Sequence, residues 1–216
     1  MNPSLLNELA SSVEWEKDVQ WRVAGVTGTH PSSWDVPLRW QCALSEHGSV
    51  AQRITALWSG LELLLPRTMM AYASKAQGLV LLHTRECGLS LVYCFDNAGS
   101  LAAQRGFRPV PSLPAIATQF PVNLAPFYQL HDGLVNFWSG DGGLLPATQW
   151  QTLVDPHSGQ QSLVKIASHG PDAFGFDVSE TPVQAYCVWP DEDEVRPQQD
   201  AWGFLDDLLA SWVEDL

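Results

Sequence analysis

Apolar and polar residues follow two different periods in the first half of the chain. Leucines and other apolar residues at helical spacing predict helices over residues 4–12 and 50–65. Ser49 directly precedes the second of these and is a candidate N-cap. Alternating apolar and polar positions predict strands over residues 19–23 and 38–44. A turn-rich stretch lies between the two strands, so we expect an antiparallel pair.

Proline and glycine divide the next segment. Pro66 ends the second helix and begins another that runs to Ala76. Residues 79–83 and 89–95 flank a short polar stretch, which predicts a hairpin. A proline-rich connection follows and is the one credible domain boundary. It separates residues 1–110, an N-terminal α+β region, from residues 111–216, and both can also belong to one domain.

The chain is organised around residues 127–150. A short helix entered after Pro126 is expected to end at Gly133, because glycine readily takes the left-handed conformation that closes a helix. Residues 141–143 then form a turn, and residues 144–146 form a short strand.

The last segment predicts three more strands and a helix. The strands cover residues 163–167, 174–178 and 186–189, and an amphipathic helix covers residues 200–216 with Asp200 as its cap. Short alternating strands mixed with amphipathic helices, without regular βαβ alternation, predict an α+β fold. We expect a mainly antiparallel sheet flanked by helices.

Five apolar residues are expected in the core: Trp202, Leu205, Leu209, Phe127 and Leu130. The last helix also places acidic residues, Glu214 among them, at its negative end. Either water screens these charges or a cationic partner meets them.

The charge balance bears on the partner. The 216 residues have a net charge of −13 and a pI near 4.6, which argues against unaided binding to nucleic acid or to anionic membranes. A basic protein is the natural complement. Residues 190–216 hold nine acidic residues and one base, Arg196. The run Asp191–Glu194 between Pro190 and Pro197 is either a solvated loop or a presented patch.

Other classes of site lack support in the sequence. The four cysteines have no Cys-x-x-Cys spacing, and the acidic run lacks the spacing of a calcium loop, so we expect no metal and no cofactor. No leader-like segment or long apolar run is visible, which predicts a cytoplasmic protein.

Catalytic motifs are also missing. The sequence has no Gly-x-Ser-x-Gly, no phosphate-binding loop and no His-Glu-x-x-His, so we expect no enzymatic activity. His131 and Asp132 are adjacent, and adjacent helical residues point about 100° apart, so they do not form a couple by themselves. One alternative stays open, a small-ligand protein or enzyme that uses the turn region from His131 to Gly143.

The order of residues in the central stretch carries a resemblance. Residues 121–133 read Pro-x-x-Leu-x-x-Phe-Tyr-x-Leu-His-Asp-Gly, and residues 143–146 read Gly-Leu-Leu-Pro. This pattern resembles the core motif of the SUKH superfamily (SMI1/KNR4-like proteins). The resemblance covers residues 111–216, so the C-terminal half is expected to be SUKH-like.

The resemblance implies a function in interbacterial competition. Bacterial members of the superfamily resemble immunity proteins, which bind and neutralise a cognate toxin from a contact-dependent or type VI-like system. Here the implied partner is a toxin that acts in the cytoplasm, and a basic nuclease matches the charge best. A regulatory scaffold, the role suggested by eukaryotic relatives, is a further alternative. The expected toxin contacts are Asp191, Glu192, Asp193 and Glu194, with Asp132 and Asp141 as second choices.

Overall fold

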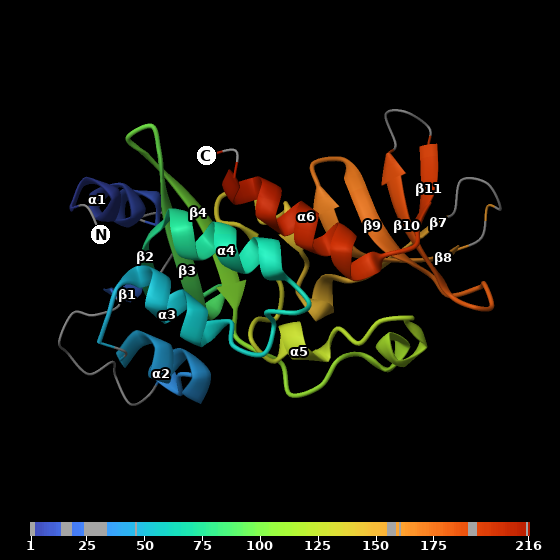
Figure 1. Ribbon diagram of the computed structural model, residues 1–216, viewed down its shortest axis with the longest axis horizontal. Helices are drawn as coiled ribbons and strands as arrows, with labels where there is room; N and C mark the ends of the chain where they lie inside the picture. The colour runs from blue at the N-terminus through green and yellow to red at the C-terminus, as the bar shows by residue number, and fades with distance from the viewer. Residues whose placement is uncertain are drawn as a thin grey trace.

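The computed structural model describes residues 3–13, 19–23, 34–45, 47–154, 159, 161–189, 194–214 and 216. It has an α+β fold, an 11-stranded antiparallel sheet with helices beside it, as expected (Figure 1). The helices are α1 (Pro3–Ser12), α2 (Leu38–Ser45), α3 (Val50–Leu57), α4 (Pro66–Lys75), α5 (Ala125–Tyr128) and α6 (Ala201–Glu214), with 3-10 helices η2 (Ala115–Gln119) and η3 (Ala147–Gln149).

The strands follow one another in the sheet almost in chain order. The order is β1-β2-β3-β4-β5-β6-β8-β9-β10-β11, and β7 pairs with β8 outside this path. One sheet therefore contains strands from both residues 1–110 and residues 111–216. The strands are β1 (Gln20–Val23), β2 (Ala76–Thr84), β3 (Gly88–Asn97), β4 (Ser100–Phe107), β5 (Leu134–Asn136), β6 (Gly143–Leu144), β7 (Gln151–Val154), β8 (Gln161–His169), β9 (Asp172–Asp177), β10 (Gln184–Trp189) and β11 (Glu194–Gln198).

The first part of the sheet is buried on both faces. In β2, Leu79 and Leu81 belong to the main core, which α2, α3, α4 and α6 also build. Their neighbours Val80 and Leu82 belong to a second core cluster with Leu9 of α1. Successive strand residues point to opposite faces, so a strand that is covered on both sides reads as a continuous apolar run. The predicted β2–β3 hairpin is confirmed.

Residues 38–44 form helix α2, so the predicted strand is wrong there. The buried side chains are Trp40 and Ala43, three positions apart, whereas Leu38 is 74% exposed. The indole N–H of Trp40 also donates to the carbonyl oxygen of Leu130 at 2.9 Å. The face that contacts the core follows helical spacing, although the apolar residues in the sequence alternate.

Helix α3 begins where the sequence predicts and ends earlier. Ser49 Oγ accepts from the backbone N–H of Gln52, and the Gln52 side chain accepts from the backbone of Ser49, which completes a capping box. The helix ends at Leu57 instead of residue 65, and Gly60 has a left-handed φ of 87°. The chain thus turns before α4 begins at Pro66.

The central helix is a single turn, α5, and it does not reach Gly133. The backbone N–H of His131 still bonds to Phe127, but that of Asp132 donates to the carbonyl oxygen of Phe107 in β4 at 3.1 Å. Gly133, with a φ of 83°, allows a close approach instead: a Cβ there would lie 2.5 Å from the backbone nitrogen of Pro146.

The C-terminal predictions are largely confirmed. The three predicted strands lie in β8, β9 and β10, and α6 is capped by Asp200, whose carboxylate accepts from the N–H of Gly203 at 2.9 Å. Trp202 is the exception in the core, because it is half-buried. The other four expected core residues are buried with at most 1% exposure: Leu205, Leu209, Phe127 and Leu130.

Helices α4 and α6 lie side by side on one face of the sheet (Figure 1). Two cationic side chains of α4 contact the negative end of α6. Arg67 Nε donates to Glu214 at 2.9 Å, and Lys75 Nζ donates to the carbonyl oxygen of Leu216 at 2.8 Å. Arg67 also pairs with Asp207. These charges at the end of α6 therefore have partners within the chain.

Candidate functional site

The expected acidic contacts fall in three different places. Asp191, Glu192 and Asp193 lie outside the described residues. Glu194 begins β11, where its backbone pairs with Trp189 of β10. β11 is the last strand in the order of the sheet, so Glu194 lies at the edge of the sheet.

Asp132, expected as a second-choice toxin contact, lies in the interior. It is buried, with 8% exposure, and its Oδ1 accepts from the backbone N–H of Ala147 at 2.7 Å. Burial raises the pKa of this carboxyl above its usual range, and the bond from Ala147 opposes that change. The carboxylate thus binds the first residue of η3, and its burial leaves little of it exposed to a partner.

Asp141 is half-buried in the turn between β5 and β6. Its carboxylate accepts from the hydroxyl of Ser139, and its carbonyl oxygen accepts from the N–H of Asn136 at 2.6 Å. The strands β8, β9 and β10 lie between β6 and β11 in the sheet. Asp141 and Glu194 therefore belong to separate parts of the sheet.

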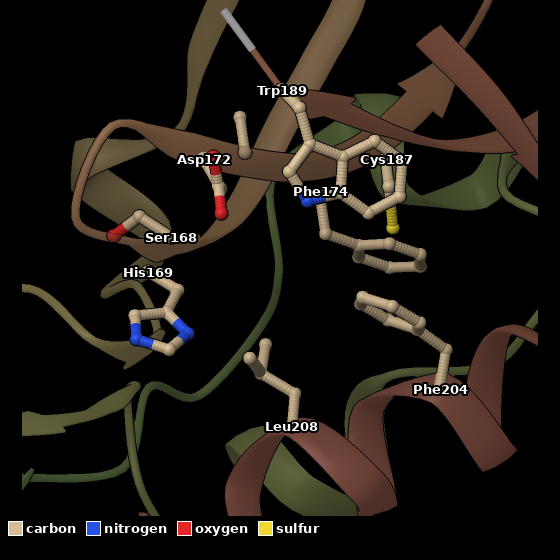
Figure 2. A pocket seen from close by; sticks show the side chains of 9 residues that line it. Ser168, His169, Asp172, Phe174, Cys187, Trp189, Phe204 and Leu208 are labelled. Carbon is tan, nitrogen blue, oxygen red and sulfur yellow. The ribbon is translucent and has the colours of Figure 1, made fainter. Parts of the chain in front are cut away.

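A pocket lies between α6 and the strands β8, β9 and β10 (Figure 2). Its volume is about 200 Å³. Figure 2 shows the rings of Trp189, Phe174 and Phe204 along one side, His169 across from them and Leu208 on α6 below. The lining residues are Ser168, His169, Asp172, Ala173, Phe174, Cys187, Trp189, Phe204 and Leu208.

The aromatic side of the pocket is closely packed. The rings of Phe174 and Phe204 stack with centroids 4.9 Å apart and an interplanar angle of 16°. The guanidinium of Arg196 lies over the Trp189 ring, 5.0 Å from its centroid. This wall combines apolar contact area with the electron-rich ring faces that attract cations.

The polar side of the pocket comes from the β8–β9 hairpin. His169 and Asp172 are direct partners across it, so their side chains lie on one face. Within the described part of the chain, the Asp172 carboxylate makes no hydrogen bond and no ion pair. Burial raises the pKa of the Cys187 thiol to about 12, with a contribution from the charge of Asp172. The thiol is thus protonated at neutral pH and is a poor nucleophile.

His131 occupies the interior. The indole N–H of Trp58 donates to the Tyr93 hydroxyl at 3.0 Å, and that oxygen lies 2.7 Å from His131 Nε2. His131 is 0% exposed, so a substrate has no access to its imidazole in this arrangement. A ligand site or active site in the turn region from His131 to Gly143 would therefore have to use side chains other than His131.

The net charge is divided unevenly along the chain. Residues 1–108 hold nine acidic and nine basic residues, whereas residues 109–216 hold fifteen acidic and two basic residues, Lys165 and Arg196. The whole net charge of −13 thus belongs to the second half, which supplies β5 to β11 and α6. Two bases of the first half, Arg67 and Lys75, contact α6.

The sequence missed the pocket because three distant segments build it, residues 168–174, 187–189 and 204–208. No group of three or more potential metal ligands occurs among the described residues, and none of their helices is long and apolar enough to cross a membrane. Comparison with family models, with curated proteins and with solved structures finds no match to this chain.

Proposed function

We propose that this protein is an immunity protein that binds and neutralises a cognate bacterial toxin. The observation that carries the proposal is the location of the net charge, −13, entirely within residues 109–216. The same residues hold the pattern that resembles the SUKH superfamily. A strongly acidic half attracts a basic partner over a distance and speeds the encounter.

The proposed partner is a basic toxin that acts in the cytoplasm, with a nuclease as the best match. A nuclease binds the phosphates of its substrate with lysine and arginine side chains. Carboxylates that occupy this groove would compete with the nucleic acid. The proposed contacts are Asp191, Glu192, Asp193, Glu194 and Asp141.

The test uses the product of the neighbouring reading frame as the toxin. Cells that express the toxin are scored for survival with this protein, and the affinity is measured at two salt concentrations. Joint reversal by Asp191→Lys and Asp193→Lys should slow association, reduce the salt dependence and weaken protection, because charges at the rim of an interface mainly steer the approach. The melting temperature should stay the same.

The matched control is a reversal on the neutral half. Glu86→Lys changes the net charge as much as Asp193→Lys does, but it lies in the exposed β2–β3 turn. We expect Asp193→Lys to weaken binding and Glu86→Lys to leave it nearly unchanged. If the joint reversal changes neither affinity nor salt dependence, the acidic run is a solvated loop. If the wild-type chain protects against no neighbouring toxin, the proposed function is wrong.

A further inference from the structure

We propose that the pocket between α6 and strands β8 to β10 binds an arginine side chain of the partner. The identity of the partner rests on the proposed function, whereas the chemistry of the pocket does not. The pocket then supplies a fixed anchoring point, in addition to the charge that draws the partner near.

The size of the pocket suits one side chain. Its volume of about 200 Å³ is below the range of about 300–1,000 Å³ that is common for drug-sized ligands. Leu208 and the stacked rings of Phe174 and Phe204 offer apolar contact to the aliphatic part of a long side chain. A single buried anchor in such a pocket is the usual form of an energetic hot spot at an interface.

The charge in the pocket selects a cation. Asp172 lines the pocket and has no hydrogen-bond or ion-pair partner within the described part of the chain. The carboxylates of Asp207 and Glu214 on α6 differ in this respect, because Arg67 pairs with both. Among the residues that the structure describes, none pairs with Asp172, so its carboxylate can form an ion pair with a cation of the partner.

The aromatic wall selects arginine over lysine. A guanidinium is planar, stacks on ring faces and donates two parallel hydrogen bonds to a carboxylate, whereas an ammonium is a compact, strongly hydrated charge. Trp189 already has one guanidinium, that of Arg196, over its ring. A second guanidinium between the rings and Asp172 would use both sides of the pocket that Figure 2 shows.

The pocket is continuous with the region that carries the proposed contacts. Trp189 lines the pocket and pairs through its backbone with Glu194, the first residue of β11. A basic surface of the partner that binds at this edge of the sheet would therefore lie next to the pocket.

The test needs no toxin. N-acetyl-arginine amide is titrated into the full chain, and the indole N–H signal of Trp189 is followed by NMR, assigned through its loss in Trp189→Phe. We expect a saturable shift with the arginine compound, a weaker one with the lysine compound and none with the neutral citrulline compound. Asp172→Asn should weaken binding about tenfold, since it removes the paired charge. Glu86→Gln, in the distant β2–β3 turn, should not.

Three outcomes overturn the inference: no binding of the arginine compound, equal binding of the citrulline compound, or an affinity that Asp172→Asn leaves unchanged. If Asp172→Asn does not fold, Leu208→Phe replaces it, because the larger ring fills the cavity from α6 and should block binding. If arginine binding fails while the chain still protects against its toxin, the pocket is wrong and the proposed function stands. If arginine binds and no neighbouring toxin is neutralised, the proposed function is wrong and the site stands.

Discussion

At the scale of single residues, His131 is a buried imidazole surrounded by four aromatic rings. The rings of Trp40 and Tyr93 lie 5.4 Å and 5.6 Å from its own, measured between centroids, and Trp58 and Phe127 lie slightly farther away. Gly106 of β4 packs so closely that a Cβ there would overlap the imidazole. Burial, with a smaller contribution from the charge of Arg39, lowers the pKa of His131 from 6.5 to about 3. The imidazole is therefore neutral in the folded protein at neutral pH.

The first prediction concerns stability in acid. The folded-state pKa of His131 is depressed, so between pH 6.5 and 3 the unfolded chain binds the proton and the folded chain does not. The contribution of His131 is complete above pH 6.5 and falls by about 1.4 kcal/mol for each pH unit as the pH drops through this window. Urea unfolding at several pH values between 7 and 4 measures the slope.

His131→Gln removes the titrating group and keeps a polar side chain that can contact Tyr93. The variant should therefore show a shallower loss of stability in acid than the wild type, whatever the other groups contribute. His47→Gln is the control, because His47 is exposed. Equal slopes for the wild type and His131→Gln would contradict the buried, neutral state of His131.

At the scale of elements, α6 binds α4 in two ways: a side chain of α6 caps the backbone of α4, and charged side chains of the two helices form ion pairs. The carboxylate of Asp206, 6% exposed, accepts from the backbone N–H groups of Arg67 and Thr68 at 2.9 and 2.8 Å. The Thr68 hydroxyl in turn donates to the carbonyl oxygen of Asp206 at 3.0 Å. The first amides of a helix lack partners within the helix, so an acidic side chain from a second helix can cap them.

The second prediction tests this cap. Asp206→Ala leaves two backbone donors without an acceptor, one of them buried and one part-buried. The variant should therefore lower the free energy of unfolding by about 1–3 kcal/mol. Asp206→Asn retains one acceptor oxygen and should cost less. Urea unfolding at pH 7 measures both.

The neighbouring residue provides the control for Asp206. Asp207 is exposed and pairs with Arg67 on the surface, and exposed ion pairs contribute little to stability. Asp207→Ala should therefore leave the unfolding midpoint nearly unchanged. Similar losses for Asp206→Ala and Asp207→Ala would mean that charge, and not the cap of α4, holds the two helices together.

At the scale of the whole molecule, one sheet and one main core extend through both regions of the chain. The main core contains Leu57 of α3 together with Leu205 of α6. Their side chains are both fully buried. Contacts of this kind couple the stability of residues 1–110 to that of residues 111–216.

The third prediction follows from this shared core. Leu57→Ala and Leu205→Ala should each cost about 2–5 kcal/mol and should lower the same unfolding midpoint, because each leaves a cavity in one core. Circular dichroism and tryptophan fluorescence should report coincident transitions. Two separate transitions, of which each variant shifts only one, would show that the two regions are independent domains.

Much of the local structure was determined by the sequence alone. Short-range signals act within a few residues, and the ones that succeeded are of this kind: the N-cap at Ser49, Asp200 before α6, Pro66 at the start of α4 and the polar turn between β2 and β3. The α+β class follows from the same periodicities. The SUKH resemblance and the toxin partner stay predictions.

The tertiary structure decided which side chains are buried and which groups meet. Residues 38–44 alternate in sequence yet form a helix, which buries Trp40 and Ala43 and brings the Trp40 indole to the carbonyl oxygen of Leu130. His131 and Asp132 looked like accessible chemistry and are interior groups. The arginine and lysine of α4 that meet the end of α6, and the pocket from three distant segments, had no local signal. The burial of these side chains and their contacts depend on residues far apart in the chain. The periodicity within one segment does not contain this information.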